Sequence, residues 1–175
     1  DALQRSEQIH RGAIEAAGAV PYTHDFRTKR YGFMGAGIEA LLGYPPHECT
    51  PEMIENTIDE ITMAGGRTFR KMSEAVRAFD EGSDTIWSAD YRIRARDGSA
   101  RWVTDAAVDE RDSDGKIVRS VGLLLDITAR KRAEAALWAS EDRYRTLAEA
   151  AHDIIFMVDR DDRIRYVNSF AARTI

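Results

Sequence analysis

The sequence predicts an α+β protein in which an antiparallel sheet packs against helices on one face. First, the hydrophobic period changes from three-and-four residues to two near residue 86. Second, two turn signals, Asp97-Gly98 and DSDG at 112–115, separate alternating runs and therefore predict three adjacent antiparallel strands. Third, helical and strand patterns are segregated along the chain, which is typical of an α+β fold.

The N-terminal elements follow in order. Residues 1–18 form a modestly amphipathic segment and predict a helix. The runs AVPYTHDF and YGFM, separated by RTKR, predict a strand pair, and Pro21 favours an edge position for the first strand. GIEALLGY predicts a short helix closed by Gly43. Thr50 as N-cap and Pro51 as first helical residue predict the start of another helix.

Two longer helices are predicted from periodicity. Residues 67–82 repeat apolar side chains at three- and four-residue steps and end at Gly82. The second helix is predicted at 128–151, directly after the last strand. We therefore expect the order helix, two strands, several short helices, three strands and a long helix.

An internal repeat divides the chain. A shift of about 134 residues aligns Leu3 with Leu137 and Asp25 with Asp159, without a gap, over about 25 residues. The segment IIFMVDRDDRIRYVN also has the strand, polar turn, strand form of the first strand pair. The prediction is one full module followed by the start of another. Because the chain begins without Met and stops inside an ordered pattern, we expect an excerpt of a longer protein.

At this point the residues resemble PAS sensor domains. The block YRIRARDGSARWVTD…DSDGKIVRSVGLLLDITARKRAE at 91–134 is similar to their C-terminal half and contains Asp126-Ile127-Thr128 at the end of the last strand. SEDRYRTLAEAAHDIIFMVDRDDRIRYVN is similar to the opening of a further PAS domain. Residues 45–66 depart from the family pattern, because IDEITMAGGR stands where relatives carry a His-Pro-Glu-Asp type turn.

The resemblance implies a domain plan and a role. It implies a five-stranded antiparallel sheet in the order 2-1-5-4-3, and an input or relay module of a multidomain bacterial signalling protein. With the periodicity it gives an N-terminal helix, a PAS domain at 19–127, a signalling linker helix at 128–151 and a truncated second PAS domain at 152–175. The helix that leaves Asp126-Ile127-Thr128 would carry the signal.

The junction after the last strand contains no Gly or Pro. Asp126 and Thr128 are both N-cap residue types, so a shift in the sheet is expected to move the helix. Cations at 130–132 oppose the helix dipole in the first turn. They predict either an ion pair, with Asp126 or with a partner chain, or simple solvation of an exposed helix end.

Read in sevens, the long helix carries a weak coiled-coil seam. Leu137 and Tyr144 share one column, and Ser140 and Leu147 share the next. The seam predicts a parallel homodimer through these helices. The alternative is an ordinary amphipathic helix that lies on its own domain.

Composition excludes several classes of function. The net charge of −5 disfavours nucleic acid as a partner, and no apolar run is long enough for membrane insertion. The single cysteine, Cys49, excludes an internal disulfide and favours a cytoplasmic location. Catalytic and metal-binding motifs are absent from the sequence, so we expect no enzyme activity and no metal in this segment. None of the four histidines lies in 67–82, where haem-binding PAS relatives supply a ligand, and Cys49 is outside the motif of light-sensing flavin relatives.

A cavity between sheet and helices is the remaining candidate site. Its expected lining is Tyr22, Phe33, Leu42, Phe69, Trp87, Tyr91, Ile93, Trp102, Leu123 and Leu125, although alternation alone leaves the inward strand face open. Large side chains at these positions favour a packed, ligand-free module over a flavin site.

Three functions follow from these patterns. The first is a non-catalytic sensory or relay module that dimerises and signals through its C-terminal helix to an output domain of histidine kinase or diguanylate cyclase/phosphodiesterase type. The second is a sensor of a cofactor or small ligand, with flavin ahead of haem. The third is a pure interaction scaffold.

Overall fold

The computed structural model describes residues 5, 9, 12–14, 16–82 and 86–174. The chain divides into two compact units, Asp1–Ala129 and Arg130–Ile175, and each is described by itself. Most of the helix predicted at 1–18 lies outside the described residues. Those described at 12–14 are helical.

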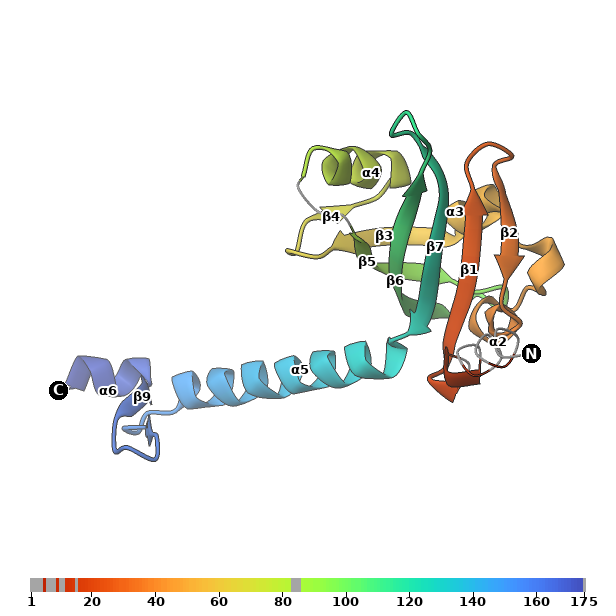
Figure 1. Ribbon diagram of the computed structural model, residues 1–175. Coiled ribbons are helices and arrows are strands. Elements are labelled where there is room, and N and C mark those ends of the chain that lie inside the picture. Colours follow the sequence, from red (N-terminus) through yellow and green to blue (C-terminus); the bar gives the residue numbers. More distant parts are fainter. Residues whose placement is uncertain (1–4, 6–8, 10–11, 15, 83–85, 175) are drawn as a thin grey trace. The chain divides into compact units, whose positions relative to one another are not determined.

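The first unit is built on a seven-stranded antiparallel sheet with the order β2-β1-β7-β6-β5-β3-β4 (Figure 1). The strands are β1 Ala19–Asp25, β2 Arg30–Met34, β3 Ile58–Met63, β4 Thr68–Phe69, β5 Ile86–Arg94, β6 Ala100–Arg111 and β7 Ile117–Asp126. The α+β class is confirmed. The predicted order 2-1-5-4-3 corresponds to β2-β1-β7-β6-β5, to which the structure adds β3 and β4 at one edge.

Turn residues account for the hairpins that the sequence predicts. Gly98 has a φ of +82° in the β5–β6 turn, and the Asp97 carboxylate accepts the backbone N–H of Ser99 at 2.8 Å. Gly115 has a φ of +79° in the β6–β7 turn. Glycine adopts such angles without a steric cost, so both reversals are local properties of the sequence.

The helices of this unit are short: α2 Gly37–Leu42, the 3₁₀ turn η1 Pro46–Glu48, α3 Pro51–Thr57 and α4 Met72–Asp80. The predicted caps are confirmed. Gly43 closes α2 in the left-handed conformation, and the Thr50 hydroxyl accepts the N–H of Met53 at 3.1 Å at the start of α3.

The prediction of a helix over 67–82 is wrong at its start. Residues 68 and 69 form β4, which pairs with β3. Gly65 and Gly66 both have positive φ and turn the chain back at this point, so Phe69 pairs with Ile61 of β3 before α4 begins. The periodicity of 67–82 concealed this hairpin, because a two-residue strand has too few residues to show its own period.

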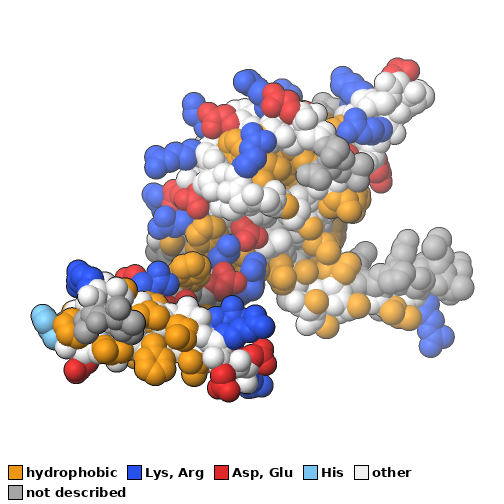
Figure 2. All heavy atoms as spheres, turned by 90° about the vertical axis from the view of Figure 1, so that its left-hand side faces the viewer, with side chains coloured by type: hydrophobic (Ala, Val, Ile, Leu, Met, Phe, Trp, Pro, Cys, Tyr) orange, Lys and Arg blue, Asp and Glu red, His pale blue; other side chains and the backbone are white. Residues whose placement is uncertain are grey.

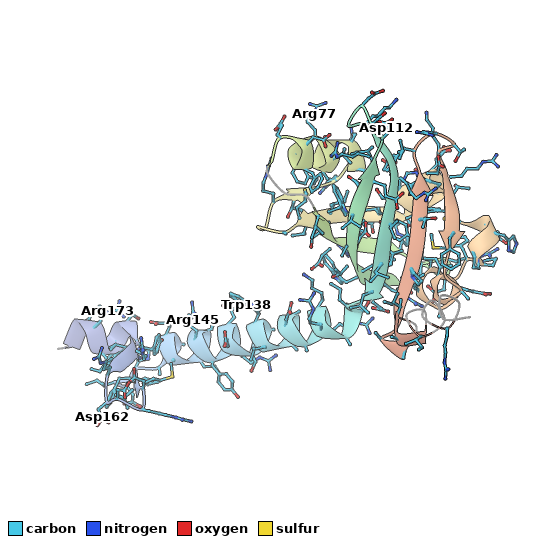
Figure 3. The ribbon with its side chains drawn as sticks, in the orientation of Figure 1. Arg77, Asp112, Trp138, Arg145, Asp162 and Arg173 are labelled. Carbon is cyan, nitrogen blue, oxygen red and sulfur yellow. The ribbon has the colours of Figure 1, made fainter. Side chains whose placement is uncertain are left out.

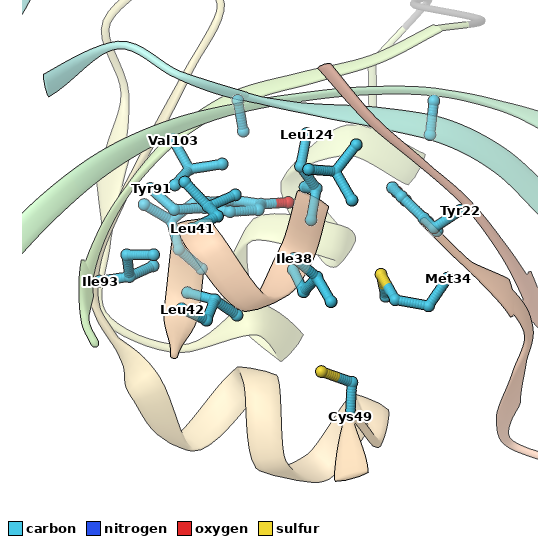
Figure 4. Close-up of a cluster of buried hydrophobic side chains, with 14 of the residues drawn as sticks. Tyr22, Met34, Ile38, Leu41, Leu42, Cys49, Tyr91, Ile93, Val103 and Leu124 are labelled. Carbon is cyan, nitrogen blue, oxygen red and sulfur yellow. The ribbon is translucent and has the colours of Figure 1, made fainter. Parts of the chain in front are cut away.

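The core lies between the sheet and α2, α3 and α4. Its labelled side chains converge in Figure 4, among them Ile38 and Leu42 of α2 and Tyr91, Val103 and Leu124 of the sheet. Ile38 and Leu42 are at most 2% exposed. This packing gives the sheet an inner face, toward the helices, and an outer face.

The second unit contains most of α5 Thr128–Ala150, the hairpin of β8 Phe156–Val158 and β9 Ile164–Val167, and α6 Ser169–Thr174. Asn168 is fully buried and connects these elements. Its amide oxygen accepts the N–H groups of Ile155 and Ala171, and its amide nitrogen donates to the carbonyls of Ala148 and Asp153.

Candidate functional site

A cavity of about 270 Å³ lies between the inner face of the sheet and α2, α3 and α4. Five of the ten sequence-predicted residues line it: Tyr22, Leu42, Trp87, Tyr91 and Ile93. They come from β1 and β5 of the sheet and from α2, which packs against the inner face of the sheet.

The other predicted lining residues lie elsewhere. Leu123 and Leu125 are 37% and 38% exposed on the outer face of β7, and Leu124 between them lines the cavity instead. Phe33 is 43% exposed. Phe69 is half-buried and packs against the core from β4, and Trp102 is also outside the cavity. On β7 every residue from 123 to 125 is leucine, so no alternation of apolar and polar residues indicates which of these side chains point inward.

A buried carboxylate is the centre of the polar part of this cavity. Asp105 on β6 is 6% exposed and accepts the hydroxyl of Tyr22 at 2.8 Å and that of Tyr91 at 2.7 Å, one on each oxygen. The indole N–H of Trp87 donates to the Tyr91 hydroxyl at 2.7 Å. Asp105 is not among the residues predicted from the sequence, although its position on β6 offered a signal. Asp105 has the same inward phase of β6 as Val103 and Ala107.

Burial controls the ionisation of this network. It raises the pKa of Asp105 to about 6, against the opposing effect of the hydrogen bonds from Tyr91 and Tyr22. Burial and the adjacent Asp105 charge raise the pKa of both phenols well above the usual value, so they remain hydrogen-bond donors at neutral pH.

Gly122 makes room for the link between β1 and β6. Tyr22 pairs with Gly122 on β7, which separates β1 from β6. A Cβ atom at position 122 would lie 2.6 Å from the Tyr22 ring. Only glycine therefore lets the ring pass over β7 to reach Asp105.

The remaining ionisable groups of the lining are mostly acidic. Glu55, Asp80 and Asp109 line the cavity with Asp105, and the described lining residues include no Lys or Arg. His24 also lines it, and burial lowers the pKa of its imidazole. Flavin nucleotides carry phosphate, which this lining would repel, so the residues present do not fit the flavin considered from the sequence.

Residues 126–128 form the exit from the sheet, where β7 passes into α5, and hydrogen bonds hold them to each other and to β6. β7 ends at Asp126 and α5 begins at Thr128. The Asp126 carboxylate accepts the Thr128 N–H at 2.8 Å. The backbone N–H of Trp102 on β6 donates to the Thr128 hydroxyl at 2.9 Å, and the Ile127 N–H donates to the Trp102 carbonyl at 2.9 Å. Hydrogen bonds to β6 thus continue past the end of β7, through the Ile127 backbone and the Thr128 side chain.

The four residues of the predicted dimer seam lie along α5. Leu137, Tyr144 and Leu147 are 61% to 71% exposed, and Ser140 is half-buried. Trp138, which lies outside the predicted seam, is 72% exposed and projects from the helix (Figure 3). Arg130 pairs with Glu134 at 3.3 Å, one turn along the same helix.

The described part of the chain also offers no site of two other kinds. No group of three or more His, Cys, Asp or Glu side chains there could hold a metal ion. None of the helices described is long and apolar enough to cross a membrane.

Two family sequence models match the chain. The sequence model described as "PAS fold" matches residues 33–124, which is more than half of the chain, and that described as "PAS domain" matches residues 142–175. The chain therefore belongs to the PAS family. PAS domains are sensory modules of signalling proteins, and several of the relatives are named as sensors.

Two curated relatives illustrate this. The chain is 36% identical over 78 residues to the two-component sensor PprA of Pseudomonas aeruginosa, covering 45% of this chain and 8% of that protein. It is 33% identical over 110 residues to the methyl sulfide methyltransferase-associated sensor of Methanosarcina acetivorans, covering 63% and 11%. The chain thus spans about a tenth of the length of these proteins.

Solved structures match over more of the chain. A sensory box histidine kinase/response regulator from Burkholderia thailandensis superposes with a TM-score of 0.58 at 25% identity, covering 78% of this chain and 98% of that one. The N-terminal domain of a diguanylate cyclase with a PAS/PAC sensor from Marinobacter aquaeolei gives a TM-score of 0.50 at 26% identity, covering 65% and 98%.

Proposed function

We propose that residues 19–127 act as a non-catalytic sensory or relay module, and that helix 128–151 passes its conformational state to an output domain of a longer chain. The observation that supports this is the exit, where Thr128 is hydrogen-bonded to β6 and capped by Asp126. Residues 152–175 would begin a second PAS domain. The names of two similar solved structures favour a histidine kinase or a diguanylate cyclase as output. The cytoplasmic location remains part of the proposal and rests on the single cysteine.

One strand connects the cavity to the exit. Asp105 and Trp102 are three residues apart on β6, or roughly 10 Å along the strand. A displacement of β6 at Asp105 would act on the backbone groups that hold Ile127 and Thr128. The cavity and the helix start are therefore coupled through backbone hydrogen bonds and require no flexible linker.

The exit can be tested in the full-length parent protein. Thr128→Val keeps the shape of the side chain and removes the hydroxyl, and a Gly-Gly insertion after Ile127 separates strand from helix. We expect both to change basal output activity several-fold, with the insertion stronger. The same insertion within the exposed turn 112–115 is the control. Unchanged output in the insertion, in Thr128→Val and in a further variant, Asp126→Ala, would instead support the interaction scaffold.

The dimer is the second part of this proposal. Leu137 and Tyr144 are exposed seven residues apart, and exposed Leu147 follows half-buried Ser140 by seven residues in the next column. A second copy of the helix would cover such a stripe. In a Cys49→Ala background, Ser140→Cys should crosslink rapidly and symmetrically. Glu141→Cys, one position along α5, should crosslink more slowly. Equal rates would contradict a parallel seam.

A second candidate function is a small-ligand sensor, which the cavity itself favours. Its volume lies near the lower end of the usual range for ligand sites. A visible absorption spectrum of the purified protein tests the flavin and haem versions, because a flavin or haem band would show that the acidic lining does not exclude them. The lining favours a ligand of a different charge.

A further inference from the structure

The cavity has an aromatic wall. Six rings line it: Tyr22, Phe26, Tyr31, Phe79, Trp87 and Tyr91. Neighbouring rings are packed edge to face, with centroids 5.4 Å apart for Phe79 and Trp87 and 5.7 Å apart for Tyr22 and Tyr31. The face of an aromatic ring is electron-rich and attracts an organic cation within about 6 Å of its centroid.

The charge of the lining has the complementary sign. Asp105 is buried, and its hydrogen-bond partners are the neutral phenols Tyr22 and Tyr91. The described residues that line the cavity include no Lys or Arg that could pair with it. A buried carboxylate without a cation is costly, and an organic cation would supply the missing charge.

Three further carboxylates line the same space: Glu55, Asp80 and Asp109. Asp109 accepts the hydroxyl of Ser120, and Glu55 reaches the cavity from α3. His24 is the basic side chain among the described lining residues, and burial favours its neutral form. An anionic ligand would therefore be repelled, whereas a cation would be attracted from several sides.

We propose that this cavity binds a small organic cation, an amine or quaternary ammonium compound whose charged head lies beside Asp105 and whose apolar body lies against the aromatic wall. A volume of about 270 Å³ suits a compact molecule with a single ring or short alkyl body. The proposal deepens the small-ligand sensor named above and rests on it.

The test compares three probes of similar size on the 175-residue chain. Phenethylamine is a cation at neutral pH, 2-phenylethanol is neutral, and 3-phenylpropionate is an anion. The indole N–H of Trp87, assigned with Trp87→Phe, reports binding by ¹H–¹⁵N NMR, because its bond to Tyr91 lies in the wall. We expect phenethylamine to shift this signal with at least about tenfold higher affinity than the alcohol, and the carboxylate to have no effect.

Variants locate the charge that gives the preference. Asp105→Asn should bring the affinities for the amine and the alcohol together. Glu55→Gln, on an exposed side chain, should reduce the preference by a smaller factor. The control Asp114→Asn removes the same charge from the exposed turn of β6 and β7 and should leave the preference unchanged.

Several outcomes would overturn the proposal. They are equal affinity for amine and alcohol in the unmodified chain, tighter binding of the carboxylate, no shift at Trp87 with millimolar amine, or the same loss in Asp114→Asn as in Asp105→Asn. The first three need no variant and so do not depend on how Asp105→Asn folds. None of these outcomes changes the result expected for the exit variants. The proposal of a relay through α5 and the proposal of a cationic ligand can therefore be refuted separately.

Discussion

Two hairpins of this chain have the same sequence form and different surroundings. The first is β1–β2 and the second is β8–β9, about 134 residues later. In both, an aspartate at the end of the first strand accepts two backbone N–H groups of the turn: Asp25 from Arg27 and Thr28, and Asp159 from Asp161 and Arg163. These bonds lower the pKa of both carboxyls. The turn is thus a local property that the repeat preserves.

The two hairpins differ in how far their side chains are buried. β1 also pairs with β7, and Val20 and Tyr22 are 3% and 8% exposed. In the second hairpin, Phe156, Met157 and Ile164 are 57% to 62% exposed. Figure 2 shows hydrophobic side chains gathered on the surface of this C-terminal segment. A local sequence can therefore specify a hairpin, whereas an inner face, and with it a cavity, requires further strands and helices.

Hydrogen exchange should give the largest contrast. Amides of β7, between β1 and β6, should exchange through global unfolding, and amides of β8 through local opening of a two-stranded ribbon. We expect protection to differ by roughly a thousandfold or more, because local openings range from near zero to the global free energy of about 5 kcal/mol or more. Native-state exchange followed by NMR measures it. Equal protection would show that the C-terminal hairpin is covered as β1 is.

Gly122→Ala should separate β1 from the polar network. The added Cβ would lie 2.6 Å from the Tyr22 ring, so the ring must move and its bond to Asp105 is lost. We expect a loss of about 3 kcal/mol in the free energy of unfolding, measured in urea. Gly12→Ala is the matched control, because no atom lies within 4 Å of its Cβ position and alanine favours a helix. A neutral Gly122→Ala would refute the close approach.

The comparison also explains what the sequence could predict. The Thr50 cap, the Asp97-Gly98 turn and both hairpins depend on neighbours in sequence, and they were predicted. The inward face of β7 depends on which side of the sheet the helices cover, and the run of three leucines conceals it. Asp105 was missed because its partners, Tyr22 and Tyr91, are 83 and 14 residues away. Non-local contacts of this kind leave little trace in local periodicity.

Asp105→Asn should change how stability depends on pH. Burial raises the folded-state pKa of Asp105 from 3.8 to about 6, so the folded state binds this proton more tightly than the unfolded state. Protonated Asp105 therefore stabilises the folded state fully below about pH 4, and this stabilisation is lost as pH rises through 6. For a difference of roughly two pH units it amounts to about 3 kcal/mol. Between pH 4 and 7 the free energy of unfolding of the unmodified chain should fall by this amount relative to that of Asp105→Asn.

Urea titrations at several pH values check this, with an exposed aspartate as control. The pKa of Asp97 is lowered by hydrogen bonds to Ser99, so its contribution is present above its unfolded pKa and is lost as pH falls. Asp97→Asn should thus change the pH dependence in the opposite direction. If Asp105→Asn followed Asp97→Asn in sign, the buried carboxylate would not be the group that titrates.

The smallest expected effect is that of a substitution at Asn168, the position in the second hairpin that the repeat makes equivalent to Met34 in the first. Met34, 8% exposed, ends β2, and Asn168, 134 residues later, follows β9. Met34→Ala should cost about 3 kcal/mol of global stability, because it leaves a void in the core.

Asn168→Ala should cost about 2 kcal/mol, and only in the second unit. The loss comes from the hydrogen bonds that Asn168 makes to Ala148, Asp153, Ile155 and Ala171. NMR signals of β8 and β9 should therefore broaden or move to random-coil positions while those of β1 and β7 remain. A global loss in Asn168→Ala would mean that the two units unfold together.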